Sequence, residues 1–233
     1  MPAIVIDGHP NPDSLAAALA MRYAAAHGDA DVLALRDLDF DPILRVGYRG
    51  AQPLEPDLLA AQASIEAADR VVVVVPVWWG SIPALAKGFF DRTFLPGWAF
   101  KYRKSGLVDG LLAGRTGRVI VTTDSPWLYL KLVGDTTVRH VRGRILRFSG
   151  LRSVSAMRVG PVRNSTPAQR EAWLEKVAVA ARRDAAADAR RPRRADRGAS
   201  AADSAAAEPV AAEPAAAEST ADLTPAAAPV ESR

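Results

Sequence analysis

The sequence has 233 residues, of which 49 % are hydrophobic, and its formal net charge is +4. A chain of this length can bury one sizeable core, and one domain with an appendage fits it better than two domains. The absence of cysteine excludes disulfide bonds, thiolate chemistry and thiolate metal sites, and no other metal site is indicated. No apolar run approaches the length of a membrane span, and the signal-peptide pattern is missing, so we expect a cytoplasmic protein without a membrane span.

Residues 190–233 differ in composition from the rest of the chain. They contain sixteen alanines and five prolines, whereas every aromatic residue lies before Lys176. Such a segment offers too little apolar surface to offset the entropy of ordering it, so we predict a domain over residues 1–189 and a disordered tail over 190–233. The tail carries six arginines and seven acidic residues, which leaves the domain a formal charge of +5. This mildly basic domain suits an anionic partner such as a phosphorylated cofactor, and we expect no nucleic acid partner.

Strand-like runs alternate with helical patterns along the domain. In chain order the sequence predicts strand 3–7, helix 14–27, strand 31–35, helix 54–68, strand 71–77, helix 83–94, strand 118–123, helix 127–148, strand 153–159 and helix 166–187. The strands are apolar throughout, which is typical of a parallel sheet covered by helices on both faces. Five βα units therefore predict an α/β fold, a flavodoxin-like three-layer α/β/α sandwich with a five-stranded parallel sheet of order 2-1-3-4-5.

Two local patterns refine this prediction. Thr166-Pro167-Ala168-Gln169 combines a hydroxyl cap, a first-turn proline and a glutamine three residues after the cap, which predicts a capping box at the last helix. Neither a Walker A sequence nor G-x-G-x-x-G follows the first strand, which argues against a nucleotide hydrolase and a dinucleotide-binding Rossmann domain. A ligand of another kind should bind at the carboxyl edge of the sheet, where the loops after strands one, three and four gather.

The loop after the first strand reads Gly8-His9-Pro10-Asn11-Pro12-Asp13-Ser14-Leu15-Ala16. Free backbone N–H groups, a hydroxyl and the positive end of a helix dipole together suit a phosphate group. An ordinary turn capped by Asp13 or Ser14 explains the same residues about as well. His9 on its own is more simply a hydrogen-bonding residue than a catalyst.

The loop after the third strand contains two adjacent tryptophans. Pro76 and Pro83 bracket Val77-Trp78-Trp79-Gly80-Ser81-Ile82, so the segment is expected to be neither strand nor helix, and its backbone N–H groups should have few internal partners. A flat conjugated ligand would use both features, by stacking on the rings and by accepting hydrogen bonds from the amides. The alternative is that the tryptophans cover the core or form a subunit contact.

The loop after the fourth strand again combines hydroxyls and aromatic rings, in Thr122-Thr123-Asp124-Ser125-Pro126-Trp127-Leu128-Tyr129. Tyr129 could donate to an oxyanion of a ligand. It could equally cap a helix face.

Together these segments resemble a known family. The stretches GHPNPDSLAAALA, PVWWGSIPALAKGFFDRTFLPGWAFKY and VTTDSPWLY are similar to the corresponding loops of flavodoxin-like NAD(P)H:quinone oxidoreductases, the family of DT-diaphorase, the modulator of drug activity B and the ancillary flavoproteins of potassium efflux. The resemblance covers residues 3 to 180. The long second stretch is specific, whereas the first alone would be weak.

The resemblance implies a noncovalent flavin, FMN or FAD, with NAD(P)H as electron donor. It places the phosphate against His9, Ser14, Leu15 and Ala16, and the isoalloxazine ring on Pro76, Val77, Trp78, Trp79 and Gly80, with Thr122, Thr123 and Asp124 at the ring's other polar edge. Tyr129 matches a family tyrosine near the N1 and O2 side of the ring and is the catalytic candidate. Phe100 and Tyr102 match an aromatic wall that reaches the substrate pocket across a homodimer interface.

Two departures limit the transfer. Gly80 stands where some relatives have a second aromatic ring. Some relatives carry a histidine about two helical turns after the tyrosine, but the matching positions here, near Val133 and Gly134, hold no imidazole, and His140 lies too far along the chain to replace it simply. The resemblance implies two-electron, ping-pong hydride transfer from NAD(P)H to a quinone or similar acceptor. The alternative is a flavoprotein regulatory subunit that binds and gates a partner protein.

Overall fold

The computed structural model describes residues 1–48, 50–126, 132 and 134–191. Its centre is a five-stranded sheet in which every pairing is parallel and the strand order is β2-β1-β3-β6-β7. The strands are β1 (Ala3–Asp7), β2 (Ala30–Ala34), β3 (Arg70–Pro76), β6 (Thr116–Thr122) and β7 (Val154–Val159). Once the separate β4–β5 hairpin is set aside, this is the predicted order, and each strand lies within two residues of its predicted start.

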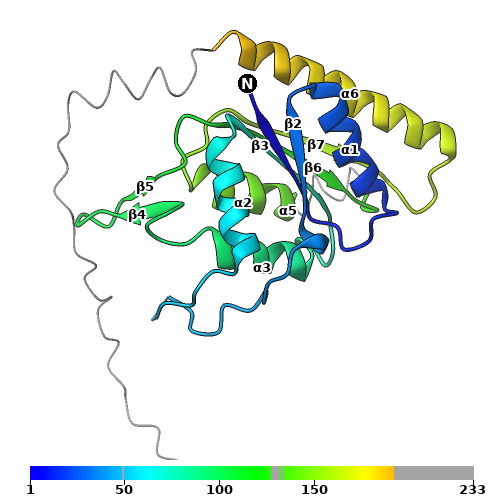
Figure 1. Ribbon diagram of the computed structural model, residues 1–233. Helices are drawn as coiled ribbons and strands as arrows, with labels where there is room; N and C mark the ends of the chain where they lie inside the picture. Colours follow the sequence, from blue (N-terminus) through cyan, green and yellow to red (C-terminus); the bar gives the residue numbers. More distant parts are fainter. Residues whose placement is uncertain (49, 127–131, 133, 192–233) are drawn as a thin grey trace, which may run out of the picture.

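Helices cover both faces of this sheet (Figure 1). On one face α1 (Leu15–His27) and α6 (Pro167–Ala189) pack on side chains such as Val5, Val72 and Ile120. On the other face lie α2 (Pro56–Ala67), α3 (Ala84–Thr93), and the short α5 (Thr136–Arg139), which continues as the π-helix η2 (His140–Arg147). Because β3 is buried along its whole length, its residues after Arg70 are apolar without alternation.

Two features differ from the prediction. A two-stranded antiparallel hairpin, β4 (Phe100–Tyr102) with β5 (Val108–Gly110), stands beside the main sheet, and the 3-10 turn η1 (Leu35–Asp37) follows β2. Three-residue strands are too short to leave a periodic signal, which is why the hairpin was not predicted. The predicted helix 127–148 is described from Thr136 onward; residues 127–131 and 133 lie outside the described part.

The last helix is fixed at both ends. The predicted capping box at Thr166 is confirmed: Thr166 Oγ1 accepts from Gln169 N at 3.2 Å and Thr166 N donates to Gln169 Oε1 at 2.8 Å. Near the other end, Asp184 and Asp188 form buried ion pairs with arginines at the amino ends of β3 and β6. The helix ends at Ala189, and the predicted tail from residue 192 onward lies outside the described residues.

In the described part of the chain, no helix combines the length and the apolar character that crossing a membrane requires.

Candidate functional site

The loops after β1, β3 and β6 meet because these three strands are neighbours and run in the same direction. Asp7 lies opposite Val74 near the end of β3, and Pro76 lies opposite Thr122 at the end of β6. Val77 N then donates to Thr122 O at 2.8 Å, which fixes the start of the tryptophan loop against the end of β6. The predicted gathering of the three loops at one edge is therefore confirmed.

The first loop is a close turn that leads into α1. Gly8 packs so tightly that a Cβ there would lie 2.7 Å from Val75 Cγ1, so a side chain cannot be accommodated without movement. Ser14 is the N-cap of α1, and its hydroxyl accepts from Ala17 N at 3.1 Å. Within the described residues, the backbone N–H groups of Leu15 and Ala16 have no hydrogen-bond partner. The helix start therefore presents two free donors at its positive dipole end.

His9 is held in one orientation by this loop. Its Nδ1 accepts from Asn11 N at 3.0 Å, and its ring meets Trp78 edge-on with the ring centroids 5.6 Å apart. Burial lowers the pKa of His9 even though Asp7 acts to raise it, so the ring is neutral at pH 7. An accepting Nδ1 places the proton of the neutral ring on Nε2, which makes that nitrogen a further donor.

A buried carboxylate beneath this loop was missed by sequence analysis. Asp7, at the end of β1, is 1 % exposed; its side chain accepts from His9 N at 3.1 Å and from Arg36 Nη1 at 2.5 Å. Arg36 also donates to His9 O at 3.3 Å. The pair therefore fixes the backbone on both sides of His9. The sequence signal that could have identified Asp7 is an acidic residue at the end of an otherwise apolar strand.

The tryptophan loop forms a tight two-residue turn. Trp78 and Ser81 exchange two backbone hydrogen bonds of 2.9 Å, and the two central residues, Trp79 and Gly80, have positive φ angles of 52° and 69°. This is the geometry of a type I′ turn, which normally carries asparagine or glycine at its centre. A tryptophan in the left-handed region is strained, and such strain is concentrated at functional sites.

The two rings of this turn differ in exposure. Trp78 is 44 % exposed and leans on His9, whereas Trp79 is exposed over its whole side chain, at 104 %. The alternative that both tryptophans cover the core of the chain is therefore wrong for Trp79. The expectation of unpartnered amides is wrong for Trp78 and Ser81, which pair with each other, but in the described residues the N–H groups of Trp79 and Gly80 have no partner.

The loop after β6 is held by one local hydrogen bond and by contacts with the loop after β7. Thr122 and Thr123 are buried, and Thr123 Oγ1 accepts from Ser125 N at 3.0 Å. Asp124 accepts from the backbone N–H groups of Val162 and Arg163 at 2.9 and 2.6 Å, which joins this loop to the one after β7. The side chain of Asp124 therefore positions a loop. The predicted catalytic Tyr129 lies outside the described residues.

Phe100 and Tyr102 do not join these three loops within one chain. They belong to β4 and line a cavity of about 920 Å³ between α3, the β4–β5 hairpin and η2, where Phe100 is buried and Tyr102 is exposed. His140 lines the same cavity. Thr136 Oγ1, one helical turn before His140, donates to Gly80 O at 2.5 Å, which links the tryptophan turn to the helical segment that carries His140.

Comparisons with known proteins identify the family of this chain. The family model for the flavodoxin-like fold matches residues 1–188. An FMN-dependent NADH:quinone oxidoreductase of Xanthomonas axonopodis pv. citri is 30 % identical over 179 residues, which cover 75 % of this chain and 90 % of the relative. The chain belongs to the flavodoxin-like quinone oxidoreductase family.

Other proteins are similar to this chain at lower identity or over a shorter part of it. The rat NAD(P)H dehydrogenase [quinone] 1 is 29 % identical over 128 residues, about half of each chain. The solved NAD(P)H:quinone oxidoreductase of Methanothermobacter marburgensis superposes with a TM-score of 0.66 over 78 % of this chain and 98 % of its own, at 22 % identity. A Bacillus anthracis FMN-dependent NADH-azoreductase, solved in complex with FMN, superposes with a TM-score of 0.63 over 79 % of this chain and 100 % of its own, at 18 % identity. These two structures show the shared fold.

The residues at this edge fit the FMN that the family name implies. A phosphate needs several donors, and the free N–H groups of Leu15 and Ala16 stand beside His9 at a helix start. A flat ring system needs an apolar surface with donors at its rim, and the turn at Trp79 and Gly80 supplies an exposed indole and two free amides. In the described residues no cluster of three or more His, Asp or Glu could hold a metal ion.

Proposed function

We propose that the protein is an FMN-dependent NAD(P)H:quinone oxidoreductase. The observation that carries this proposal is the pairing of two kinds of free donor at one sheet edge: the first-turn amides of α1 and the amides of a strained, exposed tryptophan turn. When bound, FMN supplies two-electron chemistry, in which NAD(P)H, a proton and a quinone give NAD(P)⁺ and a hydroquinone. The named relatives, which include an NADH:quinone oxidoreductase matched over 90 % of its length, support the same activity.

In this proposal the first loop holds the phosphate. The backbone N–H groups of Leu15 and Ala16 donate to it, and the neutral His9 donates through Nε2. Ser14 has two roles, because its hydroxyl oxygen caps Ala17 while its proton is free to reach an anion. FMN is favoured over FAD because the relatives named for their flavin are FMN-dependent.

The ring would lie on the turn formed by Val77, Trp78, Trp79 and Gly80, next to Pro76. The free amides of Trp79 and Gly80 are suited to stabilise negative charge that develops on a reduced ring. Thr122, Thr123 and Asp124 would line the opposite polar edge, where their backbone is held by the end of β6. Tyr129 is proposed as the further donor at this edge.

We further propose a cytoplasmic homodimer in which Phe100 and Tyr102 face the partner's ring. Tyr102 is 65 % exposed on a hairpin that stands beside the main sheet, and it is therefore free to contact a second chain. The alternative of a regulatory flavoprotein subunit is not favoured, because the relatives described above are named as oxidoreductases.

The test is stepwise mixing without oxygen. Purified protein loaded with FMN is mixed with NADH or NADPH, and the absorbance of the oxidised flavin near 450 nm should disappear. Adding a quinone in a second step should restore it, and steady-state rates should follow a ping-pong law. Bound flavin that neither nucleotide reduces would contradict the proposal, and a ternary-complex rate law would contradict its ping-pong part.

A further inference from the structure

The cavity of about 920 Å³ combines aromatic walls with cations. Five aromatic rings line it besides Tyr48. They come from α3 and its end, from β4 and from the end of η2: Phe90, Phe94, Phe100, Tyr102 and Phe148. Phe100 lies at their centre, with its ring centroid 4.9 Å from that of Phe148 and 5.5 Å from that of Tyr102. Rings arranged edge-on in this way leave faces and edges on which a flat ligand can stack.

The charged groups of the cavity are predominantly basic. Lys87 is paired with Asp91 at 2.6 Å, and Arg103 is paired with Asp109. Lys104 and Arg144 also line the cavity, and in the described part of the chain neither side chain has a hydrogen-bond or ion-pair partner. Two lining cations therefore remain without a counter-charge.

His140 adds no positive charge at neutral pH. Burial and the nearby Lys87 ammonium lower the pKa of His140, although Asp91 acts to raise it. The ring is therefore neutral at pH 7 and offers one donor and one acceptor. Asp91 is the one acidic residue among those that line the cavity, and it is already engaged by Lys87.

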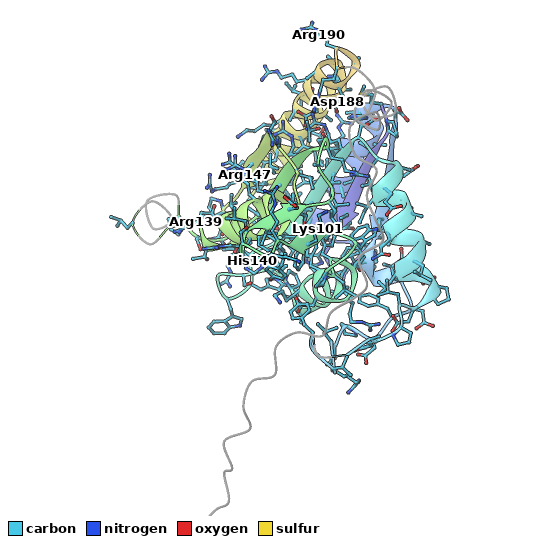
Figure 2. All side chains as sticks on the ribbon, turned by 90° about the vertical axis from the view of Figure 1, so that its left-hand side faces the viewer. Lys101, Arg139, His140, Arg147, Asp188 and Arg190 are labelled. Carbon is cyan, nitrogen blue, oxygen red and sulfur yellow. The ribbon has the colours of Figure 1, made fainter. Side chains whose placement is uncertain are left out.

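The surroundings of the cavity strengthen its positive potential. Residues 97–165 contain thirteen Lys or Arg and three Asp or Glu, whereas residues 1–96 contain seven and twelve. Figure 2 labels three of these basic residues, Lys101 of β4 and Arg139 and Arg147 of the segment from α5 to η2, together with the neutral His140. A concave site lined by one sign of charge concentrates field lines and raises the local concentration of oppositely charged ligands.

We propose that this cavity selects flat aromatic acceptors that carry a carboxylate or sulfonate group, with Lys104 and Arg144 binding the anion. The proposal rests on the proposed function, because it names the acceptor class of that enzyme. It rests in particular on the proposed homodimer, in which Phe100 and Tyr102 of this cavity face the partner's ring. Any flat aromatic molecule could stack on the phenylalanine walls, so stacking alone does not explain why two unpaired cations line the same cavity. A flat aromatic molecule with an anionic substituent would use both the rings and the cations.

The first arm of the test measures binding without turnover. The full-length, FMN-loaded protein is titrated with naphthalene-2-sulfonate and with the neutral 2-naphthol, and the variant Lys104→Gln/Arg144→Gln is titrated alongside. Each exposed ion pair contributes up to about 1 kcal/mol, so we expect the double variant to bind the sulfonate about tenfold more weakly and 2-naphthol almost unchanged. Arg152→Gln is the matched control, because Arg152 is exposed but does not line the cavity.

The second arm measures selectivity during turnover. The ratio of kcat/KM for 1,2-naphthoquinone-4-sulfonate to that for 1,2-naphthoquinone should exceed one in the wild type at low salt, and the double variant should lower it about tenfold. Equal binding of the two naphthalenes to the wild type, or equal losses for both in the double variant, would overturn the proposal. Binding as expected with no reduction of either quinone would instead overturn the proposed function, so the two failures are distinguishable.

Discussion

Polar groups are paired at the amino end of the sheet, whereas several backbone donors at the carboxyl edge have no partner among the described residues. At the amino end, Arg70 donates to both oxygens of Asp188 at 2.6 and 2.9 Å, and Arg118 does the same to Asp184 at 2.6 and 2.8 Å. At the carboxyl edge, amides at the start of α1 and in the tryptophan turn have no partner among the described residues. Both patterns occur within one rigid sheet. Paired buried charges fix the helix that closes the domain, and backbone donors without a partner among the described residues remain available for a ligand.

The amino end also explains why α6 carries acidic residues on a buried face. Asp184 and Asp188 are one turn apart on an alanine-rich helix, and Tyr23 of α1 donates to Asp184 at 2.6 Å. Burial and the adjacent Asp184 raise the pKa of Tyr23, so the tyrosine stays protonated and keeps donating. α1 therefore connects both regions: its first turn faces the carboxyl edge, and its later residues contact this network.

The largest expected effect comes from breaking the amino-end network. Arg70→Met removes the direct partner of Asp188 and leaves a buried carboxylate uncompensated, so the free energy of unfolding should fall by about 3–5 kcal/mol. Chemical denaturation followed by circular dichroism measures it. The double variant Arg70→Met/Asp188→Leu should recover most of the loss, because it buries no unpaired charge. A double variant as unstable as the single one would contradict this account.

The second effect is a loss of stability on acidification, which depends on Asp188. Burial acts to raise the pKa of Asp188, but His27 and Arg70 outweigh it and hold this pKa at about 2. Arg70 donates to the carboxylate directly, whereas His27 Nε2 lies 4.0 Å from it, beyond hydrogen-bond length. The folded pKa lies below the unfolded value, so the stabilisation is complete above about pH 4 and is lost as the pH falls toward 2.

This shift is worth about 2 kcal/mol, and it is measured as the free energy of unfolding at several values between pH 7 and pH 2. Asp188→Asn should show a shallower decline over the same range. Parallel curves for the wild type and this variant would count against the role given to Asp188.

The smallest expected effect on stability is a gain at the opposite edge. Trp79→Asn places a residue that tolerates positive φ at the centre of the type I′ turn and removes a side chain that is fully exposed, so stability should rise by up to about 1 kcal/mol. FMN binding, followed by flavin fluorescence, should weaken in the same variant. Higher stability with unchanged FMN affinity would show that the indole does not serve the ligand.

Sequence analysis predicted the sheet well because its inner strands are buried on both faces and therefore read as apolar runs such as residues 71–75. It also predicted which loops meet, since parallel strands bring their carboxyl ends to one edge. It missed the pair Asp7 and Arg36, because Asp7 ends β1, Arg36 lies in the turn η1 after β2, and no local pattern joins them. The strained conformation of Trp79 was equally hidden, because φ is set by the turn hydrogen bonds between its neighbours.

The central claim is that the first-turn amides of α1 hold the phosphate of FMN. Leu15→Pro tests it directly: proline is tolerated at the first position of a helix, and Ser14 already has the extended backbone that precedes proline, so the change removes one N–H and keeps the helix. Leu15→Ala is the matched control, because it shortens the side chain and keeps the N–H. In titrations of the apoprotein, Leu15→Pro should bind FMN about 10- to 100-fold more weakly than Leu15→Ala. Equal affinity of the two variants, or no FMN binding by the wild type, would contradict the account.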